Sequence, residues 1–403
     1  MTAPTPPRRG SPFRDVVGRI GARGFAALLQ AITLVFLARL AGPAIFGEFV
    51  VAYTVCLVAN GLLGIGSSVR ALRLSAEDEH EGLSVALFTV RAAASIVVLT
   101  MGLLIVGIAA GGLGAAAGVI VASADGLAEY AQSALAGRGR HSASSIATVA
   151  QRLLPLAGLA IGSLLQRGYF VGYCLGAALA VVIVLVTSGM PLRPVRPHLS
   201  IVRTSRGYWF ASMAAQLSQL EPWVVSLIAS PSFVGNYGIA GRLIRPLTIV
   251  SGAMQSVMVP ELSRIHGKTE FGLATRRLLR PILAYAVILI ILSPWSGGVA
   301  VMILGAEYRA SRNLVVAMVI AAALSAVAQG HQAILLARAR PAESALVVAV
   351  ASTIGLVSVV IVGVTAGDAW LWVPPLAAQA CAASGMWWRA RMAAQEPSDE
   401  RDL

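Results

Sequence analysis

The stretch AGPAIFGEFVVA at Ala41–Ala52 has a second copy in the chain, ASPSFVGNYGIA at Ala229–Ala240. The copies align without gaps and share a proline, a glycine, an aromatic residue and a final alanine: Pro43 with Pro231, Gly47 with Gly235, Phe49 with Tyr237, and Ala52 with Ala240. Their offset of 188 residues is close to half of the 403-residue chain. Since a repeat at such an offset is typical of a duplicated architecture, the sequence predicts two similar halves.

The composition indicates the solvent in which these halves fold. Hydrophobic residues make up 57% of the chain and charged residues 12%, and the mean hydropathy is +0.78. Soluble domains contain about 25% charged residues, so this chain lacks much of the polar surface that a water-soluble protein needs. We therefore expect an integral membrane protein.

Apolar segments of membrane-spanning length recur along the whole chain. A helix needs about 20 mostly apolar residues to cross the hydrocarbon core of a bilayer. Twelve segments meet that length, close to residues 22–41, 46–66, 84–110, 113–135, 144–165, 169–190, 207–229, 236–259, 281–304, 313–336, 343–364 and 370–390. The sequence thus predicts an all-α integral membrane fold of twelve transmembrane helices.

The basic residues decide the predicted orientation. If both termini lie on one side, that side carries 23 of the 31 Lys and Arg residues, the opposite side carries 4, and 4 fall within spans. Cytoplasmic loops of membrane proteins carry an excess of Lys and Arg. We therefore expect a multi-pass membrane protein with both termini in the cytoplasm.

The predicted halves are two six-helix lobes joined by a basic linker. Residues 191–206 contain three prolines and four arginines, which is typical of a cytoplasmic connection. The N-terminal lobe is then 1–190 and the C-terminal lobe 207–403. Because an even number of helices separates the repeat copies, the lobes have the same orientation and form parallel repeats around a central cavity.

Several motifs in both halves resemble one known family, the polysaccharide and lipid-linked oligosaccharide flippases of the multidrug/oligosaccharidyl-lipid/polysaccharide (MOP) exporter superfamily. The similar stretches are Leu37–Pro43 and Phe46–Phe49 in the first half, and Gln219–Glu221, Val234–Tyr237, Gly241–Leu243, Pro246, Val259–Ser263 and Gly305–Tyr308 in the second. Family members often carry an acid followed by Arg in the seventh helix, whereas here Glu221 is followed by Pro222.

The resemblance implies a transporter that flips a lipid-linked oligosaccharide or polysaccharide precursor across the bacterial cytoplasmic (inner) membrane by alternating access, as in export of lipopolysaccharide or capsule precursors. Its implied partners are the lipid-linked glycan, membrane lipids and other polysaccharide assembly proteins. Two alternatives stay open: a cation-coupled multidrug exporter of the same superfamily, and a membrane enzyme of envelope polysaccharide assembly. The outer loops are too short to hold an active site of paired acids, which disfavours the enzyme.

Charged residues inside predicted spans are candidates for a functional site, because such charges are costly in lipid and usually face an interior. Asp125 and Glu129 lie one turn apart in the fourth span, and Arg152 lies in the fifth. We expect these three to form an intramembrane polar network. Either a structural ion pair that fixes helix register or a part of the transport pathway fits the pattern.

A second group of polar residues predicts the substrate pathway. Arg242 and Arg245 are i and i+3 on the eighth span, with no acid within one turn on that helix. Two guanidinium groups on one face can hold a diphosphate head group by bidentate hydrogen bonds, although Arg242 is near enough to the interface to extend outward instead. The whole predicted pathway comprises Arg242, Arg245, Arg91, Arg23, Glu221 and Gln216.

The sequence contains no motif that points to catalysis, a cofactor or a metal. It has no phosphate-binding loop, HExxH or Gly-x-Ser-x-Gly pattern. The net charge of +13 comes from Arg clusters between apolar runs, so it does not indicate nucleic-acid binding. We therefore expect a protein that is not an enzyme and needs no cofactor.

Overall fold

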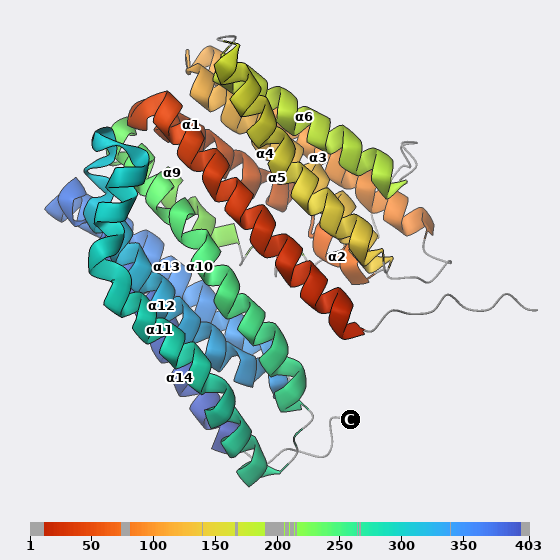
Figure 1. The fold of residues 1–403 in the computed structure, drawn as a ribbon, viewed down its shortest axis with the longest axis vertical. Coiled ribbons are helices and arrows are strands. Elements are labelled where there is room, and N and C mark those ends of the chain that lie inside the picture. Colours follow the sequence, from red (N-terminus) through yellow and green to blue (C-terminus); the bar gives the residue numbers. More distant parts are fainter. Residues whose placement is uncertain are drawn as a thin grey trace, which may run out of the picture.

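The computed structural model describes the chain from residue 12 to residue 395 with several gaps (Figure 1). The described residues are 12–73, 81–138, 140–165, 168–189, 205, 209, 213, 216–263, 265, 267–338 and 340–395. Within these ranges every regular element is a helix, so the predicted all-α class is confirmed.

The helices follow the predicted spans to within a few residues, except that the helices beginning at Pro12 and Lys268 start earlier, the latter by 13 residues, and the seventh span is described continuously only from residue 216. Their bounds are α1 Pro12–Leu63, α2 Ser67–Arg73, α3 Glu81–Ile108, α4 Leu113–Gly137, α5 His141–Leu164, α6 Tyr169–Ser188, η2 Ser218–Leu220, α9 Glu221–Ser226, α10 Pro231–Ser263, α11 Lys268–Leu304, η3 Ala306–Tyr308, α12 Ser311–Ala337, α13 Pro341–Ala366, η4 Asp368–Trp370 and α14 Val373–Gln395. By length and composition, seven described helices could cross a membrane: α1, α3, α5, α6, α11, α12 and α13.

Helix α1 contains the first two predicted spans, separated by a sharp kink. Gly42 has φ 71° and ψ 166° at this point, a backbone conformation that favours glycine because it has no Cβ. Pro43 follows and begins the second helical segment, where its missing N–H costs nothing. The glycine and proline of the first repeat copy therefore make the turn between two spans.

The helices form two groups that meet along α1 and α10 (Figure 1). Helices α3–α6 pack with α1 in the first group, and α11–α14 pack with α10 in the second. The predicted linker at 191–206 lies outside the described residues except for Ser205, whose hydroxyl accepts a hydrogen bond of 2.6 Å from Arg70. The lobe boundaries at residues 190 and 207 therefore stay predictions.

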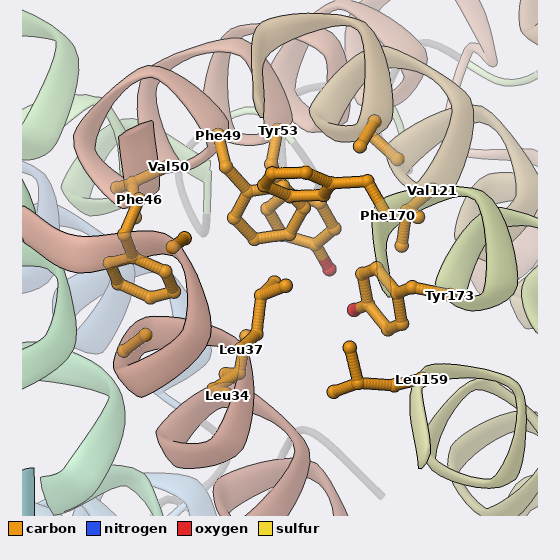
Figure 2. Close-up of a cluster of buried hydrophobic side chains, with 14 of the residues drawn as sticks. Leu34, Leu37, Phe46, Phe49, Val50, Tyr53, Val121, Leu159, Phe170 and Tyr173 are labelled. Atoms are coloured by element: carbon orange, nitrogen blue, oxygen red, sulfur yellow. The ribbon is translucent and has the colours of Figure 1, made fainter. Parts of the chain in front are cut away.

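The core of the first group is aromatic. Figure 2 shows Phe46, Phe49 and Tyr53 of α1 beside Phe170 and Tyr173 of α6. The Phe49 ring centroid lies 5.7 Å from that of Tyr53 and 5.9 Å from that of Tyr173. Such tilted and stacked contacts fix the rotation of α1 against α6. They hold Tyr53 with its hydroxyl pointing into the first group.

The two repeat copies pack against each other at one end of the molecule. A Cβ added to Gly47 would overlap the carbonyl oxygen of Pro231, and one added to Gly235 would overlap that of Pro43. The contact is thus reciprocal, as expected around a pseudo-twofold axis. Nearby, the hydroxyl of Tyr308 donates a 2.8 Å hydrogen bond to the carbonyl of Ala38. We call this the outer end, because the charge bias predicts that it faces away from the cytoplasm; both groups are in contact there.

A second internal repeat, which our sequence analysis missed, relates α4 to α12 at an offset of 200 residues. Residues 113–140 align with 313–340, and nine positions are identical: 117, 119, 120, 122, 128, 132, 135, 138 and 140 with their counterparts 200 residues later. Both helices also end alike. The amides of Arg140 and Arg340 each donate a 2.9 Å hydrogen bond to the carbonyl of Leu135 and Leu335, respectively.

Candidate functional site

A cavity of about 210 Å³ lies between the two groups of helices. Both groups contribute to its walls: Tyr53 and Thr54 from α1, Gln219 from η2, Glu221 and Pro222 from α9, Tyr237, Gly238, Gly241, Arg242 and Arg245 from α10, and Met318 from α12. Three of the predicted pathway residues, Arg242, Arg245 and Glu221, therefore line one space. We call it the central cavity.

The two arginines of α10 differ in their surroundings. Arg242 is buried, and its Nη1 donates a 3.3 Å hydrogen bond to the carbonyl of Gly238 one turn earlier. Its guanidinium carbon lies 5.5 Å from the centre of the Tyr53 ring, a cation–π distance. Arg245 is exposed and also lines the central cavity. In the part of the chain that the structure describes, neither arginine has an acid within ion-pair distance.

Glu221 lines the central cavity at a break in the seventh span. A 3-10 turn ends at Leu220 and α9 begins at Glu221, with Pro222 in its first turn. This is the interruption that Pro222 predicts, since proline cannot continue a preceding helix but fits a new first turn. The carboxylate of Glu221 accepts a 3.0 Å hydrogen bond from the hydroxyl of Tyr237, so it is held against α10 without a charged partner among the described residues.

Two other predicted pathway residues, Gln216 and Arg91, do not line the central cavity. The amide of Gln216 packs against Gly61 of α1, and its Oε1 is buried without a hydrogen-bond partner. Arg91 is buried between helices: its Nε donates to the carbonyl of Gly126 and its Nη1 to that of Asn60, each at 2.8 Å. The side chain of Arg23 lies outside the described residues.

The predicted polar network is divided between two arginines. Arg152 Nη1 lies 3.0 Å from Asp125 Oδ2, so these two residues form an ion pair. Glu129 does not join them; its carboxylate lies 3.3 Å from Nη2 of Arg91 instead. The two acids of the predicted network therefore pair with different arginines. An i, i+4 spacing places two acids on one helical face but does not decide which neighbouring helix each of them reaches.

The carboxylate of Asp125 is enclosed by three side-chain donors. Besides Arg152, the amide of Gln151 donates to Oδ1 at 2.5 Å and the hydroxyl of Tyr53 donates to Oδ2 at 2.6 Å. The amide of Gln132 continues this chain to Gln151. A buried charge is tolerated when it is paired and fully hydrogen-bonded, and this arrangement meets both conditions.

Solved structures with a similar fold include membrane transporters. The lipid II flippase MurJ in an inward closed conformation superposes with a TM-score of 0.72 at 12% identity, over 93% of this chain and 87% of that chain. An inward-facing multidrug resistance MATE family transporter of the MOP superfamily gives a TM-score of 0.63 at 15% identity, over 94% and 97% of the two chains. This chain has the MOP transporter fold. The predicted two lobes of six helices are thereby confirmed. No family model and no curated protein matches the sequence.

A third similar structure is described by the polarity of its binding pocket. It is a MOP superfamily transporter from Pyrococcus furiosus, described by the words "reverse polarity of binding pocket suggests different function". Its TM-score is 0.60 at 14% identity, over 97% of this chain and 98% of that chain. At such identities the likeness establishes the MOP fold alone.

Tyr53 connects the central cavity with the buried Asp125 site, and the sequence analysis did not identify this residue. Its ring lines the central cavity below Arg242, whereas its hydroxyl binds Asp125 in the first lobe. Figure 2 shows the hydroxyls of Tyr53 and Tyr173 pointing toward the same space. A tyrosine in an apolar run reads as a core residue. The repeat could have indicated the role of Tyr53. When the alignment is extended by one residue, Tyr53 aligns with Gly241, which also lines the central cavity.

Proposed function

We propose that this protein is a transporter that flips a lipid-linked oligosaccharide or polysaccharide precursor across the bacterial cytoplasmic membrane. The observation that carries the proposal is the central cavity with two arginines that have no acidic partner in the described part of the chain. An unpaired guanidinium at membrane depth is costly unless a ligand neutralises it. A diphosphate head group provides that charge.

The chemistry of the two arginines favours a phosphorylated ligand over other anions of similar size. The planar fork of each guanidinium matches the oxygen spacing of a phosphate. Each charge-assisted hydrogen bond contributes roughly 1.5–3 kcal/mol, so two bidentate contacts would select a diphosphate lipid over a neutral one. A cavity of about 210 Å³ would hold the phosphates but not a glycan of several sugars, so we place the glycan beyond it.

Alternating access gives the proposed route across the membrane. At the outer end the lobes are held together by the reciprocal Gly47 and Gly235 contacts and by the Tyr308 hydrogen bond. The head group would enter from the cytoplasmic side, bind Arg245 and then Arg242, and leave after the outer contacts separate. We infer that membrane lipids and other proteins of polysaccharide assembly are its partners.

The decisive experiment is complementation of a flippase-deficient bacterial strain. Arg242→Ala/Arg245→Ala should abolish glycan export at an unchanged level of protein in the membrane fraction. Arg245→Lys should restore part of the export, because lysine keeps the charge but loses the fork. Normal export by the double alanine variant would contradict the proposal.

A second candidate function rests on Glu221. This acid lines the same central cavity without a charged partner among the described residues, as a binding group for an organic cation would. A cation-coupled multidrug exporter would lose efflux of cationic dyes with Glu221→Gln and would tolerate loss of both arginines. Complementation and dye efflux measured on the same variants separate the two functions.

A further inference from the structure

A second, larger cavity lies on the opposite side of two segments that also line the central cavity, the second part of α1 and α9. Its volume is about 650 Å³ and its walls come from both lobes. It is lined by Gly47, Glu48, Val51, Ala52, Val55, Cys56, Ala59 and Leu63 of α1, Val97, Val98, Met101, Gly102, Ile105 and Val106 of α3, Ala115 and Val119 of α4, Trp223, Ser226 and Ala229 in and after α9, and Pro231 and Val234 of α10. We call it the lateral groove.

The position of the lateral groove is set by the helix ends that form it. Helix α3 contributes its last turns before Ile108, α4 contributes its first turns, and α10 begins at the groove with Pro231. Each of these ends lies at the outer end of the molecule. The groove therefore begins at the outer end and extends along the second segment of α1 as far as Leu63, the last residue of that helix.

The chemistry of the lateral groove suits hydrocarbon. Its only lining side chains with oxygen or nitrogen hydrogen-bonding groups, apart from the Trp223 indole, are Glu48 and Ser226, and the Ser226 hydroxyl donates to the carbonyl of Trp223 in its own helix. The floor is buried: Val119 is 2% and Val234 1% exposed. The mouth is open to surrounding lipid, since Met101 is 51% exposed.

The lateral groove and the central cavity share two walls. On α1, Val51 and Ala52 line the groove whereas the next residue, Tyr53, lines the central cavity. On α9, Pro222 lines the central cavity and the next residue, Trp223, lines the groove. The two spaces are thus separated by about one helix diameter, on the order of 10 Å. A lipid with its head group in one space can have its chain in the other when the segments part.

We propose that the hydrocarbon chain of the transported lipid diphosphate occupies the lateral groove while its head group is in the central cavity. This inference rests on the proposed function, because it takes the diphosphate at Arg242 and Arg245 as the tether of the chain. Volumes of 300–1,000 Å³ are typical of sites that enclose one ligand, and the groove falls within that range. Bulk phospholipid, which would enter without a tether, is the competing occupant.

Photocrosslinking of the wild-type protein in lipid nanodiscs tests the occupant. A polyprenyl diphosphate with a diazirine in its chain is compared with a diazirine phospholipid at the same mole fraction, and adducts are located by mass spectrometry. Met101 in the groove and Leu104 on the lipid-facing side of α3 form a matched pair, 51% and 55% exposed. Because tethering raises the local concentration of the chain, we expect the prenyl probe to label Met101 at least about tenfold more than Leu104. The phospholipid probe should label both equally.

Equal labelling of Met101 and Leu104 by the prenyl probe would overturn the proposal, and so would equal enrichment by the phospholipid. Filling the groove with a large side chain gives a second test. Ser226→Trp should remove the preferential labelling of Met101 by the prenyl probe, whereas Leu227→Trp at the adjacent lipid-facing position should not. Binding of inorganic pyrophosphate reports on the head-group site separately. If the wild type binds no pyrophosphate and Arg245→Ala leaves probe binding unchanged, the proposed function fails, whatever the labelling of the groove.

Discussion

The two lobes have the same scaffold but different polar residues at matching positions. The offset of 200 residues pairs Asp125 with Ser325, Glu129 with Gln329 and Arg152 with Ser352, so three charges of the first lobe are neutral in the second. Gln132 and Gln332 are identical and both hydrogen-bond to side chains of adjacent helices. Ion pairs link helices in the interior of the first lobe, whereas the matching part of the second lobe has amide and hydroxyl contacts between helices, such as Gln332 to Ser344.

The charged side chains of the two lobes also differ in what they contact. In the first lobe the charges neutralise each other within the protein: Asp125 with Arg152 and Glu129 with Arg91. In the second lobe the charges at membrane depth, Arg242, Arg245 and Glu221, have no ionic partner in the described part of the chain and face the central cavity. The duplicated fold therefore has mutually paired charges at membrane depth in one copy and cavity-facing charges in the other.

Breaking the Asp125–Arg152 pair should have the largest effect on stability. Arg152→Gln leaves a buried carboxylate unpaired, which typically costs 3–5 kcal/mol, so the unfolding temperature in detergent should fall sharply. Asp125→Asn/Arg152→Gln should recover part of the loss, since both charges are then gone. The matched change in the second lobe, Ser352→Ala, should have little effect. Strictly additive effects of the two first-lobe substitutions would contradict a paired interaction.

Introducing an Asp–Arg ion pair at the matching positions of the second lobe tests whether the two lobes place these positions alike. Ser325→Asp alone should destabilise the protein by a few kcal/mol because it buries an unpaired charge. Adding Ser352→Arg should restore part of the stability if the second lobe places these positions as the first lobe places Asp125 and Arg152. Thermal unfolding of the single and double variants gives the coupling. A double variant less stable than Ser325→Asp would show that the lobes diverge at this level.

Substitution of Gly47 or Gly235 by alanine should weaken the contact between the two repeat copies to the same extent. Gly47→Ala and Gly235→Ala each place a Cβ against a proline carbonyl of the other lobe, and overpacking of this kind typically costs about 1–3 kcal/mol. Gly298→Ala on α11 is the control, because a Cβ there meets nothing within 4 Å. Cysteine accessibility at the outer end, measured with an impermeant thiol reagent, should rise in the first two variants only. An effect confined to one copy would contradict the symmetric contact.

The exposed ion pair of the first lobe should contribute least. The Glu129 side chain is 54% exposed, and Arg91 keeps its two backbone acceptors when the carboxylate is lost. Glu129→Gln should therefore change stability by less than about 1 kcal/mol, the usual range for exposed pairs. The measurement is the same thermal unfolding assay as for Arg152→Gln. A loss as large as that of Arg152→Gln would mean that Glu129 is part of the buried network.

Sequence patterns predicted part of the candidate site. Arg242, Arg245 and Glu221 were found because a charge in an apolar span is conspicuous, and all three line the central cavity. Tyr53 was missed, since a tyrosine in an apolar run is usually a core residue. Arg91 and Gln216 were predicted for the pathway, but they pack against other helices. A one-dimensional pattern identifies a charge within a span, whereas its neighbours depend on helix rotation.

By itself, the sequence determined the membrane environment, the helical class and the division into two similar halves. These follow from composition, span length and the Pro–Gly repeat, because the bilayer requires helices that satisfy their own backbone hydrogen bonds. Only the tertiary structure decided which charges neutralise each other and which face a cavity. It paired Asp125 with Arg152 and Glu129 with Arg91, and it placed Arg242 and Arg245 at the wall of the central cavity. The physical reason is that burial and pairing depend on packing across helices far apart in the chain, and side-chain periodicity along one helix contains no information about its partner.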